Sequence, residues 1–191
     1  MMGEAITTVI LAGGQGSRIG GDKGLQLLQG RALISWVLDA VRSQSDELVI
    51  SANDGRYASF ACAVVADQTP GGAGPLAGLQ TALRIAHHAW VASVPCDTPF
   101  LPRDLISRLR AAAGDAEAVV AVVKSRRQPT IALYRKSVLP KLDAYLDAGE
   151  RKVGGWLDTL QVNEAMFDDA AAFTNINSAE ELASANQTNK P

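Results

Sequence analysis

The feature that most constrains the fold is a repeated alternation between short apolar runs and segments with helical periodicity. Most of the apolar runs are continuous and rich in valine and isoleucine, which is typical of strands buried on both faces of a parallel sheet. Strands joined by helices in this way form right-handed βαβ units. The sequence therefore predicts an α/β fold, a doubly wound, mostly parallel sheet with helices on both faces. The predicted strands are Thr7–Leu11, Leu48–Ser51, Ala63–Ala66, Trp90–Val94, Ala118–Val123 and Ile131–Tyr134.

The predicted helices lie between these runs and after them. They are Leu33–Val41, Leu76–Ala86, Leu105–Ala113 and Val138–Ala148, followed by a last helix that begins at the capping box Ser178-Ala179-Glu180-Glu181. No linker or internal repeat interrupts this organisation. We therefore expect one domain over residues 1–191, with residues 1–5 and 185–191 frayed.

The amino-acid composition limits the kinds of molecule that this protein is expected to bind. The 191 residues carry a net charge of −2, whereas a nucleic-acid-binding protein usually shows a basic stripe. No apolar stretch approaches the roughly 20 residues that span a membrane, and the N-terminus does not resemble a signal peptide. Cys62 and Cys96 suggest neither a disulfide framework nor a zinc site. We expect a cytoplasmic monomer that binds small molecules, and neither nucleic acid nor membrane.

A glycine-rich stretch follows the first predicted strand. Six glycines fall within the twelve residues Gly13–Gly24, together with Arg18 and Lys23. Such a loop brings backbone N–H groups close to an anion, and the two cations add charge-assisted contacts to phosphate oxygens. The spacing fits neither a Walker A loop, because Asp22 separates Gly21 from Lys23, nor a dinucleotide fingerprint, because Ile19 occupies the third glycine position.

Polar residues follow the later strands, and carboxyl ends of strands meet at one crevice in such sheets. Asp97 is the strongest candidate for a metal ligand, because Mg²⁺ can be bound by one carboxylate together with substrate phosphates and waters. The alternative is that Asp97 only caps a turn or the following helix. Asn53 and Asp67 are candidates for the base or ribose of a nucleotide, or simply turn residues. The loop Gly74–Gly78 either lies flat against a base or only begins a helix. Lys124–Arg127 either meets a phosphate of a second substrate or is a solvated loop.

Several motifs together resemble a known family. The loop Leu11-Ala12-Gly13-Gly14…Ser17-Arg18…Gly20…Asp22-Lys23 resembles that of nucleotidyltransferases, which join a nucleoside triphosphate to a phosphorylated acceptor. Within that group, the chain is similar to the molybdenum cofactor guanylyltransferases. The similar segments run in family order from Leu11 to Leu182 and are Gly21–Leu25, Gly74–Gly78, Cys96–Phe100, Pro129–Leu133, Gly149–Val153 and Asn175–Leu182.

The resemblance implies a nucleotide-diphospho-sugar transferase-like, Rossmann-like fold and transfer of GMP from GTP to molybdenum-bound molybdopterin. It implies Mg²⁺ as cofactor, held by Asp97, and transient contact with proteins that deliver or receive the molybdenum cofactor. The residues that it assigns to GTP are Leu11, Ala12, Gly13, Gly14, Lys23, Asn53, Asp67, Gly78 and Asp97. Arg18, Lys23 and Asp97 are the expected catalytic residues. The residues expected on the pterin side are Arg151, Lys152, Asn175 and Asn177.

The residues fit this chemistry independently of the resemblance. No nucleophilic triad or activated cysteine is evident, and a phosphate acceptor is already an anionic nucleophile. Catalysis then depends on positioning and charge neutralisation, for which cations and a metal ligand suffice. Two alternatives remain open: a cytidylyltransferase on the same pterin or a sugar-phosphate nucleotidyltransferase, and a non-catalytic GTP-binding chaperone of the cofactor.

Overall fold

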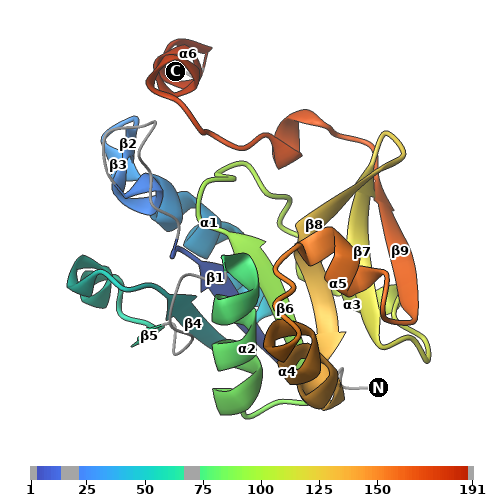
Figure 1. Cartoon of the computed structure of the whole chain (residues 1–191). Coiled ribbons are helices and arrows are strands. Elements are labelled where there is room, and N and C mark those ends of the chain that lie inside the picture. The colour runs from blue at the N-terminus through green and yellow to red at the C-terminus, as the bar shows by residue number, and fades with distance from the viewer. Residues whose placement is uncertain (1–3, 14–21, 67–73, 189–191) are drawn as a thin grey trace.

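A seven-stranded sheet runs through the molecule in the order β5-β4-β1-β6-β8-β7-β9 (Figure 1). The computed structural model describes residues 4–13, 22–66 and 74–188. All neighbouring strands pair in parallel except β8, which is antiparallel to both β6 and β7. The predicted doubly wound, mostly parallel sheet is therefore confirmed. The strands are β1 Ile6–Leu11, β4 Glu47–Ser51, β5 Ala63–Val65, β6 Trp90–Pro95, β7 Ala118–Val123, β8 Arg126–Arg135 and β9 Val162–Phe167.

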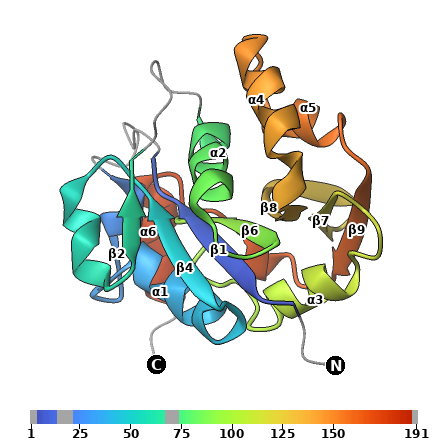
Figure 2. The ribbon, with the colours of Figure 1, turned by 90° about the horizontal axis from the view of Figure 1, so that it is seen from below.

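Helices cover both faces of the sheet, as predicted (Figure 2). The helices α1 (Leu33–Val41) and α3 (Leu105–Ala111) pack on one face, and α2 (Pro75–Ile85), α4 (Leu139–Asp147) and α5 (Val153–Leu157) pack on the other. Alternate residues of each strand enter the two resulting cores. Val9 packs with α2, while its neighbour Ile10 packs with α1, and both side chains are fully buried. Burial on both faces explains why the strand sequences are continuously apolar.

The sequence analysis missed several short elements. One is a small hairpin, β2 (Leu27–Leu28) with β3 (Arg31–Ala32), and another is the edge strand β9. β9 pairs only with β7 and has several exposed residues, so it lacks the apolar run by which the central strands were predicted. The others are the short helix α5 and, over the described residues, five 3-10 helices: η1 Lys23–Leu25, η2 Arg42–Gln44, η3 Gly55–Phe60, η4 Lys136–Val138 and η5 Ala171–Phe173.

Strand β8 begins five residues earlier than predicted, at Arg126 rather than Ile131. The chain there contains Pro129, which has no N–H to donate to a sheet. The pairing register with β7 shifts between Val120 and Ala121, so that Ala132 and Gln128 pair with consecutive residues of β7. This bulge accommodates the proline and allows the strand to continue on its other side.

Both ends of the described chain are more ordered than predicted. The Glu4 carboxylate accepts a hydrogen bond from Trp90 Nε1 at 2.7 Å and pairs with Arg110, so this residue is anchored rather than frayed. Helix α6 (Ala179–Thr188) continues into the segment for which fraying was predicted from Ala185. None of the helices described is long and apolar enough to cross a membrane.

The carboxyl ends of the central strands lie side by side. Ala12 N, just after β1, donates to Ser51 O at 2.8 Å, and Cys96 N, just after β6, donates to Leu11 O at 3.1 Å. The segment between β9 and α6 returns to this edge, where Ile176 N donates to Asp97 O at 2.9 Å. Residues from the beginning, middle and end of the chain therefore meet at one edge of the sheet.

Candidate active site

A cavity of about 290 Å³ opens at the carboxyl ends of β1, β4 and β6. Seven of the residues predicted to bind substrate line it, and they come from five separate parts of the chain. They are Leu11, Gly13, Lys23, Gly78, Asp97, Asn175 and Asn177. The other lining residues are Ser51, Gly74, Pro75, Pro95, Cys96 and Thr130. The predicted convergence of strand ends on one crevice is thus observed.

The centre of this cavity is an ionic contact between Lys23 and Asp97. Lys23 Nζ lies 3.2 Å from Asp97 Oδ2 and donates to Asn177 Oδ1 at 2.6 Å. The Asp97 side chain is only 9% exposed, and its second oxygen, Oδ1, is buried without a hydrogen-bond partner among the described residues. A buried carboxylate oxygen without a partner is energetically costly, so this atom is free to accept a cation or a donor from a ligand.

The donor set at Asp97 fits one magnesium ion. Mg²⁺ prefers oxygen ligands and is commonly bound by one or two carboxylates together with phosphates and waters. Over the described residues, no group of three or more His, Cys, Asp or Glu side chains forms a complete protein cage for a metal. Such a site would therefore rely on substrate phosphate, as expected for a phosphoryl-transfer reaction.

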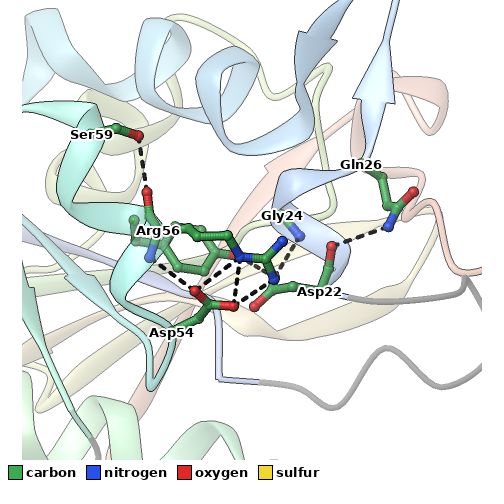
Figure 3. Close-up of polar contacts among 7 residues, drawn as sticks. Asp22, Gly24, Gln26, Asp54, Arg56 and Ser59 are labelled. Atoms are coloured by element: carbon green, nitrogen blue, oxygen red, sulfur yellow. Dashed lines mark hydrogen bonds and ion pairs between the residues drawn. The ribbon is translucent and has the colours of Figure 1, made fainter.

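A tight turn presents Lys23 to the cavity. Asp22 is the N-cap of η1, and its Oδ1 accepts from Gly24 N at 3.1 Å (Figure 3). The same oxygen accepts a hydrogen bond from the hydroxyl of Tyr57, a fully buried residue of η3. Burial, together with the neighbouring Cys96 and Asp22, raises the pKa of Tyr57, so the phenol stays protonated and remains a donor. A side chain at Gly24 would collide with the Tyr57 hydroxyl, so only glycine fits there.

The η3 helix is itself held by a local ion pair. Asp54, its N-cap, accepts from Arg56 N at 2.9 Å and binds the Arg56 guanidinium through both carboxylate oxygens (Figure 3). Hydrogen bonds from Arg56 hold the pKa of Asp54 below its usual value. Since η3 follows β4 directly, the end of β4 and the Lys23 turn are joined through Tyr57.

Gly78 allows helix α2 to approach the sheet closely. A Cβ at this position would lie 2.5 Å from Ser51 Oγ and 2.9 Å from Leu11 Cδ2. Ser51 and Leu11 are the last residues of β4 and β1, respectively. The first turns of α2 therefore form a wall of the cavity, and glycine is required for packing there whether or not it also contacts a base.

The two asparagines near the C-terminus occupy different positions in the cavity. Asn177 contacts Lys23, whereas Asn175 Oδ1 accepts from Thr98 Oγ1 at 2.8 Å. Thr98 is fully buried directly after Asp97, so this bond fixes the returning segment against the end of β6. Both residues are therefore part of the same cluster as the predicted catalytic pair.

Other predicted residues lie outside this cluster. Arg151 Nη1 donates to the carbonyls of Leu146 and Glu150, both at 2.7 Å, and so caps the end of α4. The structure does not bring Arg151 or Lys152 to the cavity wall. Asn53 is exposed after β4 and also does not line it, while Ala12 is buried behind it. The predictions for Gly14, Arg18 and Asp67 lie outside the described residues.

Sequence reasoning did not single out some residues of the site. Thr130 and Ser51 line the cavity but carry no distinctive motif of their own, although Thr130 lies within a segment that resembles the family. Cys96 is also part of the wall, and burial raises the pKa of its thiol, with the Asp97 charge adding to the effect. The thiol is therefore protonated and unsuited to nucleophilic catalysis.

Comparisons with known proteins agree with this arrangement. A family model described as MobA-like NTP transferase domain matches residues 8–162. A protein of Burkholderia ambifaria named molybdenum cofactor guanylyltransferase is 47% identical over 94% of both chains. One of the same name from Cupriavidus metallidurans is 43% identical over 94% of this chain and 93% of its own. The region matched by the family model ends at residue 162, before Asn175 and Asn177, which the structure brings to the cavity.

Solved structures show the same fold. Molybdopterin-guanine dinucleotide biosynthesis protein A from Archaeoglobus fulgidus superimposes with a TM-score of 0.77 at 25% identity, covering 95% of this chain and 97% of its own. A 4-diphosphocytidyl-2C-methyl-D-erythritol synthase from Anaerococcus prevotii also gives 0.77, at 15% identity, over 97% of this chain and 96% of its own. The second likeness concerns the fold alone and confirms the expected nucleotide-diphospho-sugar transferase-like architecture.

Proposed function

This chain belongs to the MobA-like NTP transferase family, and from that premise we propose that it transfers GMP from GTP to the terminal phosphate of molybdenum-bound molybdopterin. The products are pyrophosphate and the guanine dinucleotide form of the cofactor. The names of its relatives support the nucleotide and the acceptor. The proposal includes a cytoplasmic location, where GTP is available, and transient contacts with proteins that deliver or receive the cofactor.

The observation that carries the proposal is the Lys23–Asp97 contact at the carboxyl ends of β1 and β6. A cation and a carboxylate with one unpartnered oxygen meet there, in a cavity lined by backbone, glycine and amide groups. Phosphoryl-transfer sites require this combination, because the protein positions reactants and neutralises charge rather than forming a covalent bond.

In the reaction, an oxygen of the acceptor phosphate attacks the α-phosphorus of GTP. The new P–O bond forms as the bond from the α-phosphorus to the bridging oxygen of the leaving pyrophosphate breaks. Lys23 lines the cavity and would stabilise the negative charge that develops on the phosphates, and Asn177 fixes the direction of its ammonium group. No side chain has to remove a proton, because the attacking phosphate is already ionised.

Asp97 is the residue that would hold Mg²⁺, through Oδ1, the oxygen that has no partner among the described residues. The ion would supply further neutralisation of phosphate charge and would fix the orientation of the triphosphate. Lys23 would then have a second role, since its ammonium group, 3.2 Å from the other carboxylate oxygen, holds the Asp97 side chain in position.

The test is pyrophosphate release with molybdenum-bound molybdopterin as acceptor and Mg²⁺ present, comparing GTP, CTP and ATP. We expect release with GTP alone, and none when the acceptor is omitted. Release with CTP instead would retain the reaction class and contradict the choice of base. Tight GTP binding without pyrophosphate release from any nucleotide would contradict transfer and favour a binding protein.

A further inference from the structure

A second pocket lies beside the active site, at the hairpin that joins β7 to β8. We infer that it binds the negatively charged end of the acceptor, the end remote from the reacting phosphate. The inference rests on the proposed function, because it assigns part of the acceptor of that reaction. The pocket has a volume of about 410 Å³ and is lined by Val123, Lys124, Arg126, Gln128, Ala170 and Phe173.

The two cations of this pocket, Lys124 and Arg126, are not paired with any acidic side chain in the part of the chain that the structure describes. Among the described residues, neither the Lys124 nor the Arg126 side chain makes a hydrogen bond or ion pair. The adjacent Arg127 differs, since its Nε donates to Glu164 Oε1 at 2.8 Å and its Nη1 lies 3.4 Å from Asp158 Oδ1. Successive residues of a strand point to opposite faces of the sheet, so Arg127, which pairs with Glu164, and Arg126, which lines the pocket, lie on different faces.

The backbone of the hairpin turn is unusual for its residues. Lys124 and Ser125 both have left-handed φ angles, of 46° and 61°. Two-residue hairpin turns of this kind normally contain asparagine or glycine, because other side chains cost on the order of 1 kcal/mol each in this conformation. A lysine in this conformation at the lining of a pocket is consistent with a binding role, since strained backbone is concentrated at functional sites.

Two segments of the chain run directly from the active site into this second pocket. On β8, Thr130 lines the first cavity and Gln128 the second. In the returning C-terminal segment, Asn175 lines the first and Phe173 the second. The Cα atoms of residues two apart are separated by at most about 7 Å, so the two pockets are lined by adjacent parts of the same two segments. In Figure 1 the β7–β8 hairpin extends past the end of β6 on the side away from β4.

This geometry matches the shape and charge of the proposed acceptor. If its phosphate reacts beside Lys23 and Asp97, the rest of the molecule can extend over Thr130 and Asn175 towards the hairpin. Thiolate and oxo ligands make the molybdenum end of the acceptor negatively charged, and Lys124 and Arg126 offer two uncompensated positive charges there. Charge in this pocket should therefore affect binding of the acceptor and not binding of GTP.

The experiment compares Arg126→Gln with Arg127→Gln, the same change at adjacent positions of one strand. Anaerobic equilibrium binding of molybdenum-bound molybdopterin is measured for both variants and for the unmodified chain, with GTP binding as a second readout and a melting curve for each protein. We expect Arg126→Gln to raise the Kd for the acceptor about tenfold and Arg127→Gln to change it less than about twofold. The Kd for GTP should stay constant, and Arg126→Lys should restore most of the acceptor affinity.

An unchanged Kd for the acceptor in Arg126→Gln would overturn the inference. An equal increase of this Kd in Arg126→Gln and Arg127→Gln would also overturn it, because loss of any positive charge would then have the same effect. Failure of the unmodified chain to bind the acceptor would overturn it as well. Pyrophosphate release separates this inference from the proposed function. The expected binding pattern without release in the unmodified chain would support the acceptor pocket and contradict the transfer reaction.

Discussion

At the scale of single residues, the two carboxylate oxygens of Asp97 have different surroundings: Oδ2 contacts Lys23, and Oδ1 has no partner among the described residues. This difference predicts the effect of replacing the carboxylate by an amide. Asp97→Asn keeps the shape of the side chain but removes its charge. We expect kcat to fall at least about 100-fold at saturating Mg²⁺, while the fold is retained. Steady-state pyrophosphate release and a melting curve measure both effects. Asp115→Asn, at an exposed position, is the control, and a near-normal kcat in Asp97→Asn would exclude the metal role.

Lys23 is expected to contact the part of GTP that leaves. Its ammonium group lies between Asp97 and Asn177, so Lys23→Gln should weaken binding of GTP much more than binding of GMP. Titration calorimetry with both nucleotides measures the difference. Lys141→Gln, at an exposed lysine paired with Glu117, is the matched control. Equal losses of affinity for GTP and GMP would show that Lys23 does not act on the β- and γ-phosphates.

The close packing around Gly78 predicts that a larger residue at this position causes a steric clash. Gly78→Ala places a methyl group 2.5 Å from Ser51 Oγ, so α2 must move away from the sheet. We expect a loss of about 1–3 kcal/mol in the free energy of unfolding and weaker GTP binding. Gly154→Ala is the control, because a Cβ at that helical position meets nothing within 4 Å and should be neutral or stabilising. Urea unfolding measures the free energy of unfolding of both variants. Equal values would contradict the tight packing around Gly78.

At the scale of elements, Tyr57 couples two 3-10 helices that lie far apart in the sequence. Its hydroxyl donates to the Asp22 cap of η1, while its ring belongs to η3 after β4. Tyr57→Phe should cost about 1–3 kcal/mol of stability because a buried hydrogen bond to a charged group is lost. We also expect weaker GTP binding, since η1 carries Lys23.

The control for this prediction lies on the same helix. Ser59 donates only to the exposed carbonyl of Arg56, at 2.9 Å, so Ser59→Ala should change neither stability nor nucleotide affinity. Urea unfolding and GTP titration are compared for the two variants. A Tyr57→Phe protein that is less stable but binds GTP normally would limit the contact to a structural role.

The elements also show which local signals are visible in a sequence. Buried strands such as β1 and β7 could be predicted because burial on both faces demands continuous apolar residues. β9 could not, because it lies at the edge, and the start of β8 was hidden because Pro129 argues against a strand unless a bulge accommodates it. The 3-10 helices η1 and η3 have local caps, but the contact that joins them links residues 35 positions apart, which no local pattern specifies.

At the scale of the whole molecule, a carboxylate at the opposite edge of the sheet predicts how stability depends on pH. Glu47, at the start of β4, accepts from Thr7 Oγ1 of β1 at 2.6 Å and contacts His87 after α2. Burial opposes ionisation, but the hydrogen bonds from Thr7 and His87 outweigh it and lower the pKa of Glu47 from its usual 4.5. Its contribution is therefore present above pH 4.5 and is lost as the pH falls through the folded-state pKa.

We accordingly expect Glu47→Gln to lower the melting temperature by a few degrees at neutral pH. The difference from the unmodified chain should shrink as the pH falls below 4.5. Melting curves at a series of pH values test this, with Glu150→Gln at an exposed position as the control. A difference that is independent of pH would contradict the linkage.

Much of the site could be predicted because a parallel sheet gathers strand ends at one edge. Lys23, Gly78 and Asp97 follow from that rule together with their residue types. Asn175 and Asn177 were expected only through the family resemblance, because a segment that crosses back over the sheet leaves no periodic signal. The resemblance also suggested Arg151, whose donors instead satisfy carbonyls at the end of α4.

The returning C-terminal segment has a consequence for synthesis. Lys23 is synthesised before Asp97, and Ile176 and Asn177 follow more than 150 positions after Lys23. The hydrogen bonds from Lys23 to Asn177 and from Ile176 N to Asp97 O can form only after that. A chain still emerging from the ribosome can form the β1–β4–β6 centre of the sheet before these groups exist. Until they emerge, the Lys23 ammonium lacks its amide partner, so full affinity for nucleotide should arise only after the segment with Asn177 has left the ribosome.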